Sequence, residues 1–420
     1  MMRFLYTLVF YLALPLVFLR LFRRGKKAPD YRQAWSERMG YLPVALNDCI
    51  WIHAVSFGES IAATPLIKCL QKTYPNLPIL VTNTTPTGKA HLRKTFGDSI
   101  HISYFPYDLP AVLARFLRRS QPKILILIET ELWPNLLKAC QKRHIPVLLA
   151  NARLSERSAA KYAKVKRLTT GMLEDISCVA AQSKEDGQRF VNLGLPADRL
   201  HITGSIKFDI TISNEIRHQA SELKATWQDR PVWIAASTHQ GEEEHILMAF
   251  GLILKAFPDA LLILVPRHPE RFNGVKELCE HQGFTLITRS SQRPCTASTQ
   301  IYLGDTMGEM LLLYGASQIA FIGGSFVPVG GHNLLEPTAL GIPSIIGPNY
   351  FNFKEITTML VASEATYIVK NPEELAERII ELFDSPMLAR QRGESGLRVL
   401  EQNRGALAKL CDIIGGILKD

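Results

Sequence analysis

The chain has 420 residues, of which 47% are hydrophobic, with a formal net charge of +9 and a mean hydropathy near zero. This composition excludes a disordered chain and a polytopic membrane protein, and the length exceeds the roughly 250–300 residues that one hydrophobic core supports, which predicts two domains. The seven cysteines include no C-x-x-C pair, which argues against a zinc site or a disulfide framework and favours reduced thiols.

The N-terminus combines an apolar segment with a basic one. Residues 4–19 carry no charge and fall just short of the about 20 residues that usually cross a bilayer. Residues 1–40 hold eight Lys or Arg against two acidic residues, a net of +6, which leaves +3 for the rest of the chain. The basic cluster follows the apolar segment, which is the wrong order for a cleaved signal peptide and keeps the downstream chain in the cytoplasm.

We therefore predict a membrane anchor with a basic collar over residues 1–27 of a protein located at the inner membrane of a cell, with the folded part on the cytoplasmic side. Its polyanionic partner is expected to be anionic lipid and not nucleic acid, because the charge flanks an apolar segment and is not spread with aromatic residues over a working face. The sequence leaves open whether the helix spans the bilayer or lies in one leaflet.

The rest of the chain alternates strand and helix patterns in two similar halves. Continuous apolar runs predict parallel strands buried on both faces, and hence two doubly wound α/β domains. We predict an N-terminal Rossmann-like domain over 28–210, a linker over 211–229, and a C-terminal Rossmann-like domain over 230–420 closed by C-terminal helices. Ligands of such sheets bind beyond the carboxyl ends of the strands, so a site in a cleft between the domains is expected. The predicted strands are 49–55, 79–82, 100–105, 124–128, 147–150, 178–181, 200–203, 232–236, 261–265, 284–287, 301–303, 319–322, 344–346 and 367–369.

In the first half, four charged residues follow three of the predicted strands. Pro65 fits only the first turn of a helix, which predicts that Glu59 lies in the preceding loop, where its carboxylate is a candidate general base. The alternative is a carboxylate that only complements a helix N-terminus; because the helix dipole lowers its pKa, a base also needs some burial. Glu129 and Glu131 follow another strand just before a helix that begins at Trp133-Pro134, where one of them could be a helix cap. Lys207 is either a functional cation or a solvated surface lysine.

In the second half, a glycine-rich stretch over residues 322–343 is the most informative feature. Its glycines let the backbone turn tightly and approach a ligand closely. A helix predicted to begin near Asn333 favours an anion such as a nucleotide phosphate, and Glu336 is placed to reach a ribose hydroxyl. The alternative is that Asn333 and Glu336 form a capping box. Arg267 and His268 end another strand and suit a phosphate or a carboxylate.

Residues 304–309 follow a further strand of the second half and offer backbone N–H groups to the same ligand. The sequence contains no Walker P-loop, H-E-x-x-H, G-x-S-x-G or D-x-D motif, so neither a metal nor a cofactor is predicted.

Six of these segments, taken in order, resemble the bacterial 3-deoxy-D-manno-octulosonic acid (Kdo) transferases of lipopolysaccharide assembly, and the resemblance covers essentially the whole chain. The glycine-rich segment alone would indicate only a GT-B glycosyltransferase. The segments are Ser-Phe-Gly-Glu59, Glu129-Thr-Glu131-Leu-Trp-Pro-Asn, Gly-Ser-Ile-Lys207-Phe-Asp, Pro-Arg267-His268-Pro, Gly-Asp-Thr-Met-Gly-Glu309 and Gly-Gly-His-Asn333-Leu-Leu-Glu336-Pro.

The resemblance implies a GT-B enzyme that moves Kdo from CMP-Kdo to the lipid A precursor lipid IVA, with inversion and without a metal. It implies that Glu59 is the proton acceptor and that Glu129 and Lys207 stabilise the transition state. The residues implied to hold CMP are Arg267, His268, Met307, Gly308, Glu309, Asn333, Leu334, Leu335 and Glu336.

Two other functions remain open from the residues alone. One is a membrane-associated GT-B transferase that uses a UDP-sugar and a lipid-linked acceptor. The other is a non-catalytic, membrane-tethered nucleotide-binding module, which the presence of both Glu59 and Lys207 disfavours. The sequence does not determine the number of Kdo units transferred, the acyl-chain preference, the oligomeric state or the extent of domain closure.

Overall fold

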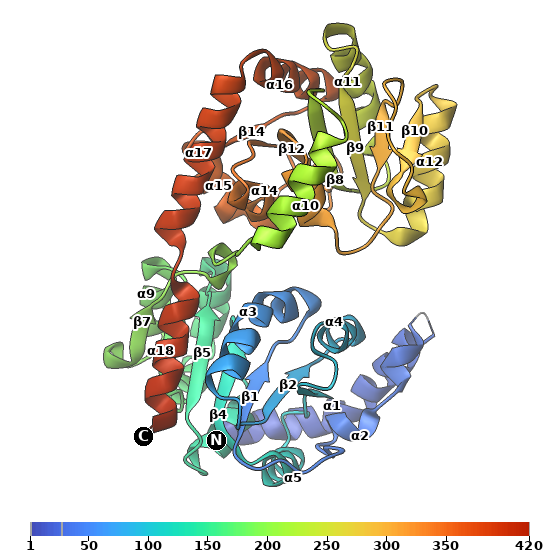
Figure 1. The fold of residues 1–420 in the computed structure, drawn as a ribbon. Coiled ribbons are helices and arrows are strands. Elements are labelled where there is room, and N and C mark those ends of the chain that lie inside the picture. The colour runs from blue at the N-terminus through green and yellow to red at the C-terminus, as the bar shows by residue number, and fades with distance from the viewer. Residues whose placement is uncertain (1, 27, 420) are drawn as a thin grey trace. The chain divides into compact units, whose positions relative to one another are not determined.

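The structure is a computed structural model that describes residues 2–26 and 28–419 (Figure 1). The chain divides into two compact units. Unit 1 comprises Met1–Asp209 and Arg404–Asp420, and unit 2 comprises Ile210–Asn403. Each unit is built around a seven-stranded parallel sheet, which confirms the predicted pair of doubly wound α/β folds.

The sheet of unit 1 contains the seven strands predicted for the first half of the chain. They are β1 (Cys49–His53), β2 (Ile79–Asn83), β3 (His101–Tyr104), β4 (Pro122–Ile128), β5 (Val147–Ala152), β6 (Cys178–Ala181) and β7 (Leu200–Ile202). Their spatial order is β3-β2-β1-β4-β5-β6-β7. Alternate residues of β1 enter different cores, with Trp51 in one cluster and Ile50 and Ile52 in the other. Burial on both faces explains why the strands are continuous apolar runs.

The helices of unit 1 begin at recognisable capping residues. The hydroxyls of Ser56, Thr85, Ser155 and Ser183 accept backbone hydrogen bonds at four helix starts. The α-helices are α1 (Met2–Arg24), α2 (Trp35–Arg38), α3 (Phe57–Thr73), α4 (Pro86–Phe96), α5 (Pro110–Ser120), α6 (Pro134–Gln141), α7 (Glu156–Ala163), α8 (Lys166–Glu174), α9 (Lys184–Asn192) and α18 (Ala406–Lys419), and the 3-10 helices are η1 (Pro29–Arg32), η2 (Ala197–Arg199) and η3 (Ile206–Phe208).

The sheet of unit 2 contains the seven strands predicted for the second half. They are β8 (Val232–Thr238), β9 (Leu261–Pro266), β10 (Leu286–Thr288), β11 (Ile301–Leu303), β12 (Ile319–Ile322), β13 (Ser344–Ile346) and β14 (Thr366–Ile368). Their order is β10-β11-β9-β8-β12-β13-β14.

The helices of unit 2 connect these strands. They are α10 (Asn214–Ala225), α11 (Glu243–Ala256), η4 (Pro269–Arg271), α12 (Phe272–His281), η5 (Arg289–Ser291), α13 (Met310–Gly315), α14 (Leu335–Ala339), η6 (Phe351–Phe353), α15 (Lys354–Ala362), α16 (Pro372–Asp384) and α17 (Pro386–Asn403).

Each sheet has one point at which the chain reverses its direction of winding. In unit 1 the chain moves outward from β1 through β2 and β3 and then returns to β4, on the other side of β1. In unit 2 the equivalent neighbours are β8 and β12. Such a switch point opens a crevice at the carboxyl ends of its two strands, which is where ligands of doubly wound folds bind.

The structure corrects two of the predicted domain limits. The last helix, α18, belongs to unit 1, because Ala406, Leu410 and Ile414 are part of the core that α3 also contributes to. The predicted C-terminal helices are therefore divided between the two units, with a break after Asn403, where Gly405 has a φ of 96°. The segment 211–229, predicted as a linker, contains α10, which packs against α13 of unit 2.

Two of the seven cysteines, Cys69 of α3 and Cys411 of α18, face each other although they lie 342 positions apart in the chain. Their Cα atoms are 7.3 Å apart, more than the about 4.4–6.8 Å of a disulfide bridge, so their proximity does not contradict the predicted reduced thiols. The pair lies on the same contact between α3 and α18 that returns the C-terminus to unit 1. The other five are free, and four of them are buried.

Candidate active site

Glu59 lies in the first turn of α3, directly after β1. Ser56 caps the helix by accepting a hydrogen bond from the backbone N of Glu59 (3.3 Å). The carboxylate of Glu59 in turn accepts hydrogen bonds from Val55 N (2.7 Å) and from the Ser56 hydroxyl (3.0 Å). The prediction that Glu59 precedes the helix is therefore wrong, because this reciprocal capping starts α3 at Phe57 and leaves Pro65 in its interior. The capping role weighed from the sequence is present.

Glu59 is one of three carboxylates at the switch point of unit 1. Glu129 directly follows β4, and Glu131 lies two residues further on. Glu129 has a φ of 63°, so the chain turns sharply there. Burial, followed by the charge of Glu59 and then that of Glu129, raises the pKa of Glu131 to about 7. The charges of Glu59 and Glu129 thus both act on Glu131.

Burial also raises the pKa of Glu59 above its ordinary value. The hydrogen bond from Val55 N opposes this effect, and the charge of Glu129 adds to it. Two hydrogen bonds occupy two of the about four lone-pair positions of a carboxylate, which leaves positions for a substrate proton. A carboxylate with a raised pKa is a stronger base than an exposed one, provided that it is ionised.

Lys207 supplies a cation to this group. Its Nζ is 3.6 Å from Oε1 of Glu129. Lys207 lies in η3, after the edge strand β7, so the chain must return from the edge toward the centre of the sheet. Asn151 of β5, which has a φ of 53°, fixes this return by accepting a hydrogen bond from Ile206 N at 3.2 Å. The structure therefore brings Glu59, Glu129 and Lys207 into one charged cluster.

We expect the substitution Glu131→Gln to raise the melting temperature at pH 8 but not at pH 5. The folded chain raises the pKa of Glu131 to about 7 from an ordinary 4.5. The folded state therefore binds this proton more tightly than the unfolded state does. The resulting stabilisation is fully present below about pH 4.5 and is lost as the pH rises through about 7. Above that pH the buried charge is a penalty that an amide avoids, so the gain is on the order of 1–3 kcal/mol.

Thermal unfolding of both proteins at the two pH values tests this expectation. Glu174→Gln, at an exposed position of α8 in the same unit, is the matched control. An equal shift for Glu131→Gln at both pH values would contradict the assignment.

In unit 2, a fully buried carboxylate organises the glycine-rich segment after β12. Glu242 accepts hydrogen bonds from the backbone N of Gly324 (2.5 Å), Ser325 (2.9 Å), Phe326 (2.8 Å) and His239 (2.9 Å). These bonds tie the end of β12 to the end of β8 across the switch point. The sequence patterns assign no role to Glu242. Its role depends on a contact between residues 82 to 84 positions apart, which no local pattern indicates.

Asn333 and Glu336 face each other at the start of α14. The helix begins at Leu335, two residues later than predicted. Asn333 Oδ1 accepts a hydrogen bond from Leu335 N (3.1 Å), and Asn333 Nδ2 donates to Glu336 Oε1 (3.2 Å). The capping box weighed from the sequence is not formed, because the N-cap of α14 is Leu334 and the two side chains bond to each other. Burial raises the pKa of Glu336, while the Asn333 hydrogen bond and the charge of Arg267 lower it. The charge of Arg267 therefore reaches Glu336, which places the two side chains at one site in unit 2.

Three histidines lie at the same end of this sheet. The Nε2 atoms of His239 and His332 are 2.8 Å apart, so one ring donates a proton and the other accepts it. The ring of His268 stands edge-on to that of His239, with centroids 5.3 Å apart. Burial, then the charges of His239, Arg267 and His268, lowers the pKa of His332 to about 4. Sequence reasoning named His268 but missed the pair His239 and His332, although both follow switch-point strands.

These histidines do not form a metal centre. Within the described residues 2–26 and 28–419, no group of three or more His, Cys, Asp or Glu side chains is arranged to hold a metal ion. Arg267 is instead the fixed cation of the group, and its backbone N donates to Thr238 O at 3.0 Å. A fixed cation at this place suits an anionic ligand.

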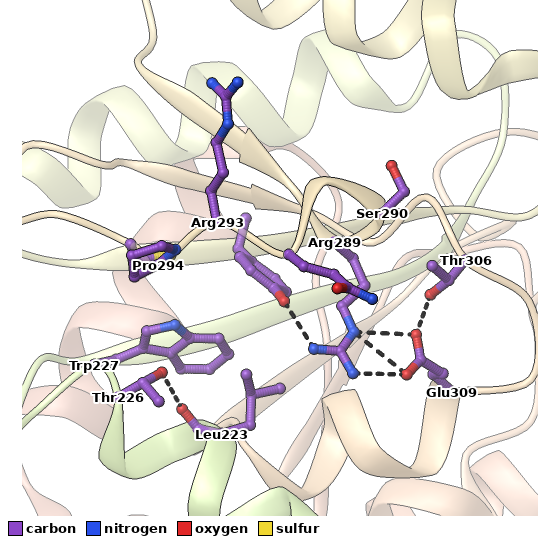
Figure 2. Close-up of a pocket in the computed structure, with 12 residues that line it drawn as sticks. Leu223, Thr226, Trp227, Arg289, Ser290, Arg293, Pro294, Thr306 and Glu309 are labelled. Atoms are coloured by element: carbon purple, nitrogen blue, oxygen red, sulfur yellow. Dashed lines mark hydrogen bonds and ion pairs between the residues drawn. The ribbon is translucent and has the colours of Figure 1, made fainter.

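Met307, Gly308 and Glu309 follow β11, and Glu309 lines a pocket of about 550 Å³ (Figure 2). Arg289 donates to both oxygens of Glu309, at 2.8 Å and 3.1 Å, and Thr306 donates to the same carboxylate. Figure 2 shows Glu309 held between these two side chains. The carboxylate is thus neutralised within unit 2, which leaves the backbone of this segment for a ligand. Sequence reasoning missed Arg289, although it directly follows β10.

The described geometry defines a fold class before the sequence defines a family. Two parallel sheets, each with charged and polar residues at its switch point, are the GT-B architecture of glycosyltransferases. A crystal structure of a glycosyltransferase from Rickettsia africae matches 89% of this chain and 100% of its own length with a TM-score of 0.57 and 18% identity, a likeness of fold alone.

Comparisons of sequence identify the family. A family model described as 3-Deoxy-D-manno-octulosonic-acid transferase (kdotransferase) matches residues 33–210. A 3-deoxy-D-manno-octulosonic acid transferase of Haemophilus influenzae is 46% identical, covering 99% of this chain and 98% of that protein. A crystal structure of the C-terminal CMP-Kdo binding domain of WaaA from Acinetobacter baumannii is 37% identical, covering 45% of this chain and 99% of its own, with a TM-score of 0.43. The chain belongs to the Kdo transferase family and is a glycosyltransferase.

Proposed function

We propose that this enzyme transfers Kdo from CMP-Kdo to the lipid A precursor lipid IVA, with inversion at the transferred carbon. The observation that carries the proposal is the cluster of Glu59, Glu129, Glu131 and Lys207 at the switch point of unit 1. A carboxylate with a raised pKa among charged neighbours is what a sugar hydroxyl needs for deprotonation. The motifs shared with the family and the name of the 46% identical relative support the choice of Kdo.

In the proposed reaction, Glu59 removes the proton from an acceptor sugar hydroxyl. The hydroxyl oxygen forms a bond to the anomeric carbon of Kdo, on the face opposite the leaving phosphate. The bond between that carbon and the phosphate oxygen breaks, and its electron pair leaves with CMP. Lys207 and Glu129 are assigned to stabilise the transition state, and the proposal routes no step through a metal ion.

Unit 2 is proposed to hold CMP. Arg267 and His268 are assigned to the phosphate, because a fixed cation pairs well with a leaving group that gains negative charge. Met307, Gly308 and Glu309 are assigned to CMP through their backbone. Asn333, Leu334, Leu335 and Glu336 are assigned to the same ligand, and the carboxylate of Glu336 suits a ribose hydroxyl.

The acceptor is proposed to be reached from the cytoplasmic side of the inner membrane. α1 is long and apolar enough to associate with a bilayer, and basic residues follow it. A basic surface suits an acceptor that carries phosphate groups. Unit 1 is accordingly proposed to bind the acceptor.

Nucleotide competition separates this function from that of a UDP-sugar transferase with the same fold. We expect CMP to displace a fluorescent CMP analogue from the enzyme at concentrations at least about 10-fold lower than UDP, which corresponds to about 1.4 kcal/mol of discrimination. Arg267→Ala should weaken CMP binding, whereas Arg217→Ala, which removes an exposed arginine of α10 in the same unit, should leave it unchanged. Stronger displacement by UDP than by CMP would refute the assigned donor.

A further inference from the structure

The helix α1 contacts α6 and α8 of unit 1, and its first part lies along that unit, while its end extends outward from the unit (Figure 1). Near its start, Thr7 and Asn135 of α6 exchange hydrogen bonds at 2.9 Å and 3.1 Å, and Tyr6 bonds to Asp108. Near its end, the ring of Phe18 contacts that of Trp35, with centroids 5.2 Å apart. One face of the helix is therefore bound to the folded unit over at least three turns.

These contacts are incompatible with a helix that crosses the bilayer. Tyr6 and Phe18 are 12 positions apart, about 18 Å along a helix axis. A spanning helix runs through about 30 Å of hydrocarbon, so it would carry Tyr6 and Thr7 to the far side, away from unit 1. It would also leave Asp108, which is 1% exposed, without its hydroxyl partner.

The opposite face of α1 is apolar and uncovered. Its side chains recur at helical spacing, and the most exposed are Phe4 (74%), Leu12 (71%) and Leu16 (68%). Further exposed members of this face are Leu5, Leu8 and Leu19. An apolar stripe of this length on a folded protein marks an interaction surface.

The charges around the stripe point to lipid as its partner. Arg20, Arg23 and Arg24 are exposed at the end of α1. α8, which contacts α1, begins with the exposed residues Lys166 and Arg167. An apolar helix face bordered by cations is the arrangement of helices that lie at an anionic membrane surface.

We propose that α1 lies in the plane of the membrane, with its exposed face in one leaflet and its other face on unit 1, and does not span the bilayer. This inference rests on the membrane association included in the proposed function. It brings unit 1, with Glu59, to the surface from which a lipid acceptor presents its sugar. Both ends of the helix then remain on one side of the membrane.

Crosslinking in the membrane-bound full-length enzyme tests the packed face. In the Thr7→Cys/Asn135→Cys variant, mild oxidation should join the two positions in the membrane fraction, as read by mass spectrometry of the linked peptides. The Leu12→Cys/Asn135→Cys variant is the control and should not crosslink, because Leu12 lies on the exposed face. Absence of the first crosslink while activity is retained would overturn the proposal.

Depth-dependent quenching tests the exposed face independently. The test uses the single variants Leu5→Cys, Leu12→Cys and Leu19→Cys in a Cys295→Ser background. Each variant is labelled with an environment-sensitive fluorophore. It is then bound to phosphatidylethanolamine–phosphatidylglycerol vesicles that contain lipids brominated at different depths. We expect all three labels at the same shallow depth. A maximum depth at Leu12 with shallow labels on either side indicates a spanning helix, and labels shielded from all brominated lipids indicate a protein partner; either result overturns the proposal.

The exposed face also predicts a change in affinity. Leu12→Glu should weaken partitioning onto these vesicles by about 10-fold to 100-fold, the range expected when one buried leucine is lost. Val44→Glu, at an exposed position of unit 1 outside α1, should not. If the wild-type enzyme does not bind vesicles at all, the proposed membrane association is wrong. The proposed Kdo transfer is tested separately, with an acceptor dispersed in detergent.

Discussion

Glu59→Gln is expected to lower the turnover of Kdo transfer by about 10²-fold to 10⁴-fold, the usual contribution of a positioned general base, while CMP binding is retained. The amide keeps nearly the same shape, and its oxygen still accepts the hydrogen bond that Val55 N donates to the carboxylate (2.7 Å). It has no basicity with which to deprotonate the acceptor. Steady-state transfer and CMP titration, measured on the same preparation, separate the two effects.

The helix-capping role of Glu59 requires its own control. Ser56→Ala removes the cap of α3 and the hydroxyl that bonds to Glu59, which costs about 0.5–2 kcal/mol of stability. It leaves the carboxylate in place, so turnover should fall far less than in Glu59→Gln. Equal losses in the two variants would mean that Glu59 only holds the helix. Unaltered turnover in Glu59→Gln would show that Glu59 is not the general base. A non-catalytic nucleotide-binding module likewise has no general base.

The pH profile gives the assignment a second readout. The base must be ionised, so transfer should decline as the pH falls through the pKa of Glu59, which burial raises above its ordinary 4.5. This acid limb should therefore lie at higher pH than for an exposed carboxylate. Any residual transfer by Glu59→Gln should lack the limb.

Lys207→Met is expected to lower turnover by about 10²-fold to 10³-fold, the usual effect of removing one group that stabilises developing charge. Methionine retains the length of the side chain but not its charge. The carboxylate of Glu129 then loses the cation 3.6 Å away. Because an unpaired negative charge raises the pKa of neighbouring carboxyl groups, the acid limb of the profile should move to higher pH.

Two further variants test whether Lys207 acts directly. Lys207→Arg keeps the charge and should restore part of the turnover and the position of the acid limb. Asn151→Ala removes the hydrogen bond that holds Ile206, and so should lower turnover by misplacing Lys207 without removing its charge. CMP affinity is measured alongside and should change little. A normal pH profile with unchanged turnover in Lys207→Met would remove Lys207 from the mechanism.

The strands and the family were predictable because their signals are local. Apolar runs such as Ile124–Ile128 have no alternative to burial on both faces of a parallel sheet. Pro65 predicts a start of α3 that is too late, because proline is expected in the first turn of a helix. Ser56, followed three residues later by Glu59, is the sequence signal for the observed start at Phe57. The extra turns before Pro65 follow from that cap.

Other features depend on contacts between distant residues. Lys207 reaches Glu129 only because Asn151 returns the chain from β7, and Glu242 reaches Gly324 only after the second sheet has formed. The assignment of α18 to unit 1 likewise depends on its packing against α3, which its sequence pattern does not indicate. The clustering of charged side chains at strand ends was visible in the sequence, but their partners were not.

The most direct test of Kdo transfer is the mass of the product formed by the wild-type enzyme. Purified enzyme is incubated with CMP-Kdo and lipid IVA, and both the lipid product and the released nucleotide are quantified. The account predicts a lipid whose mass increases by whole Kdo residues, with one CMP released for each residue added. An unchanged lipid with CMP-Kdo, together with glycosylation of a lipid acceptor from a UDP-sugar, would contradict it.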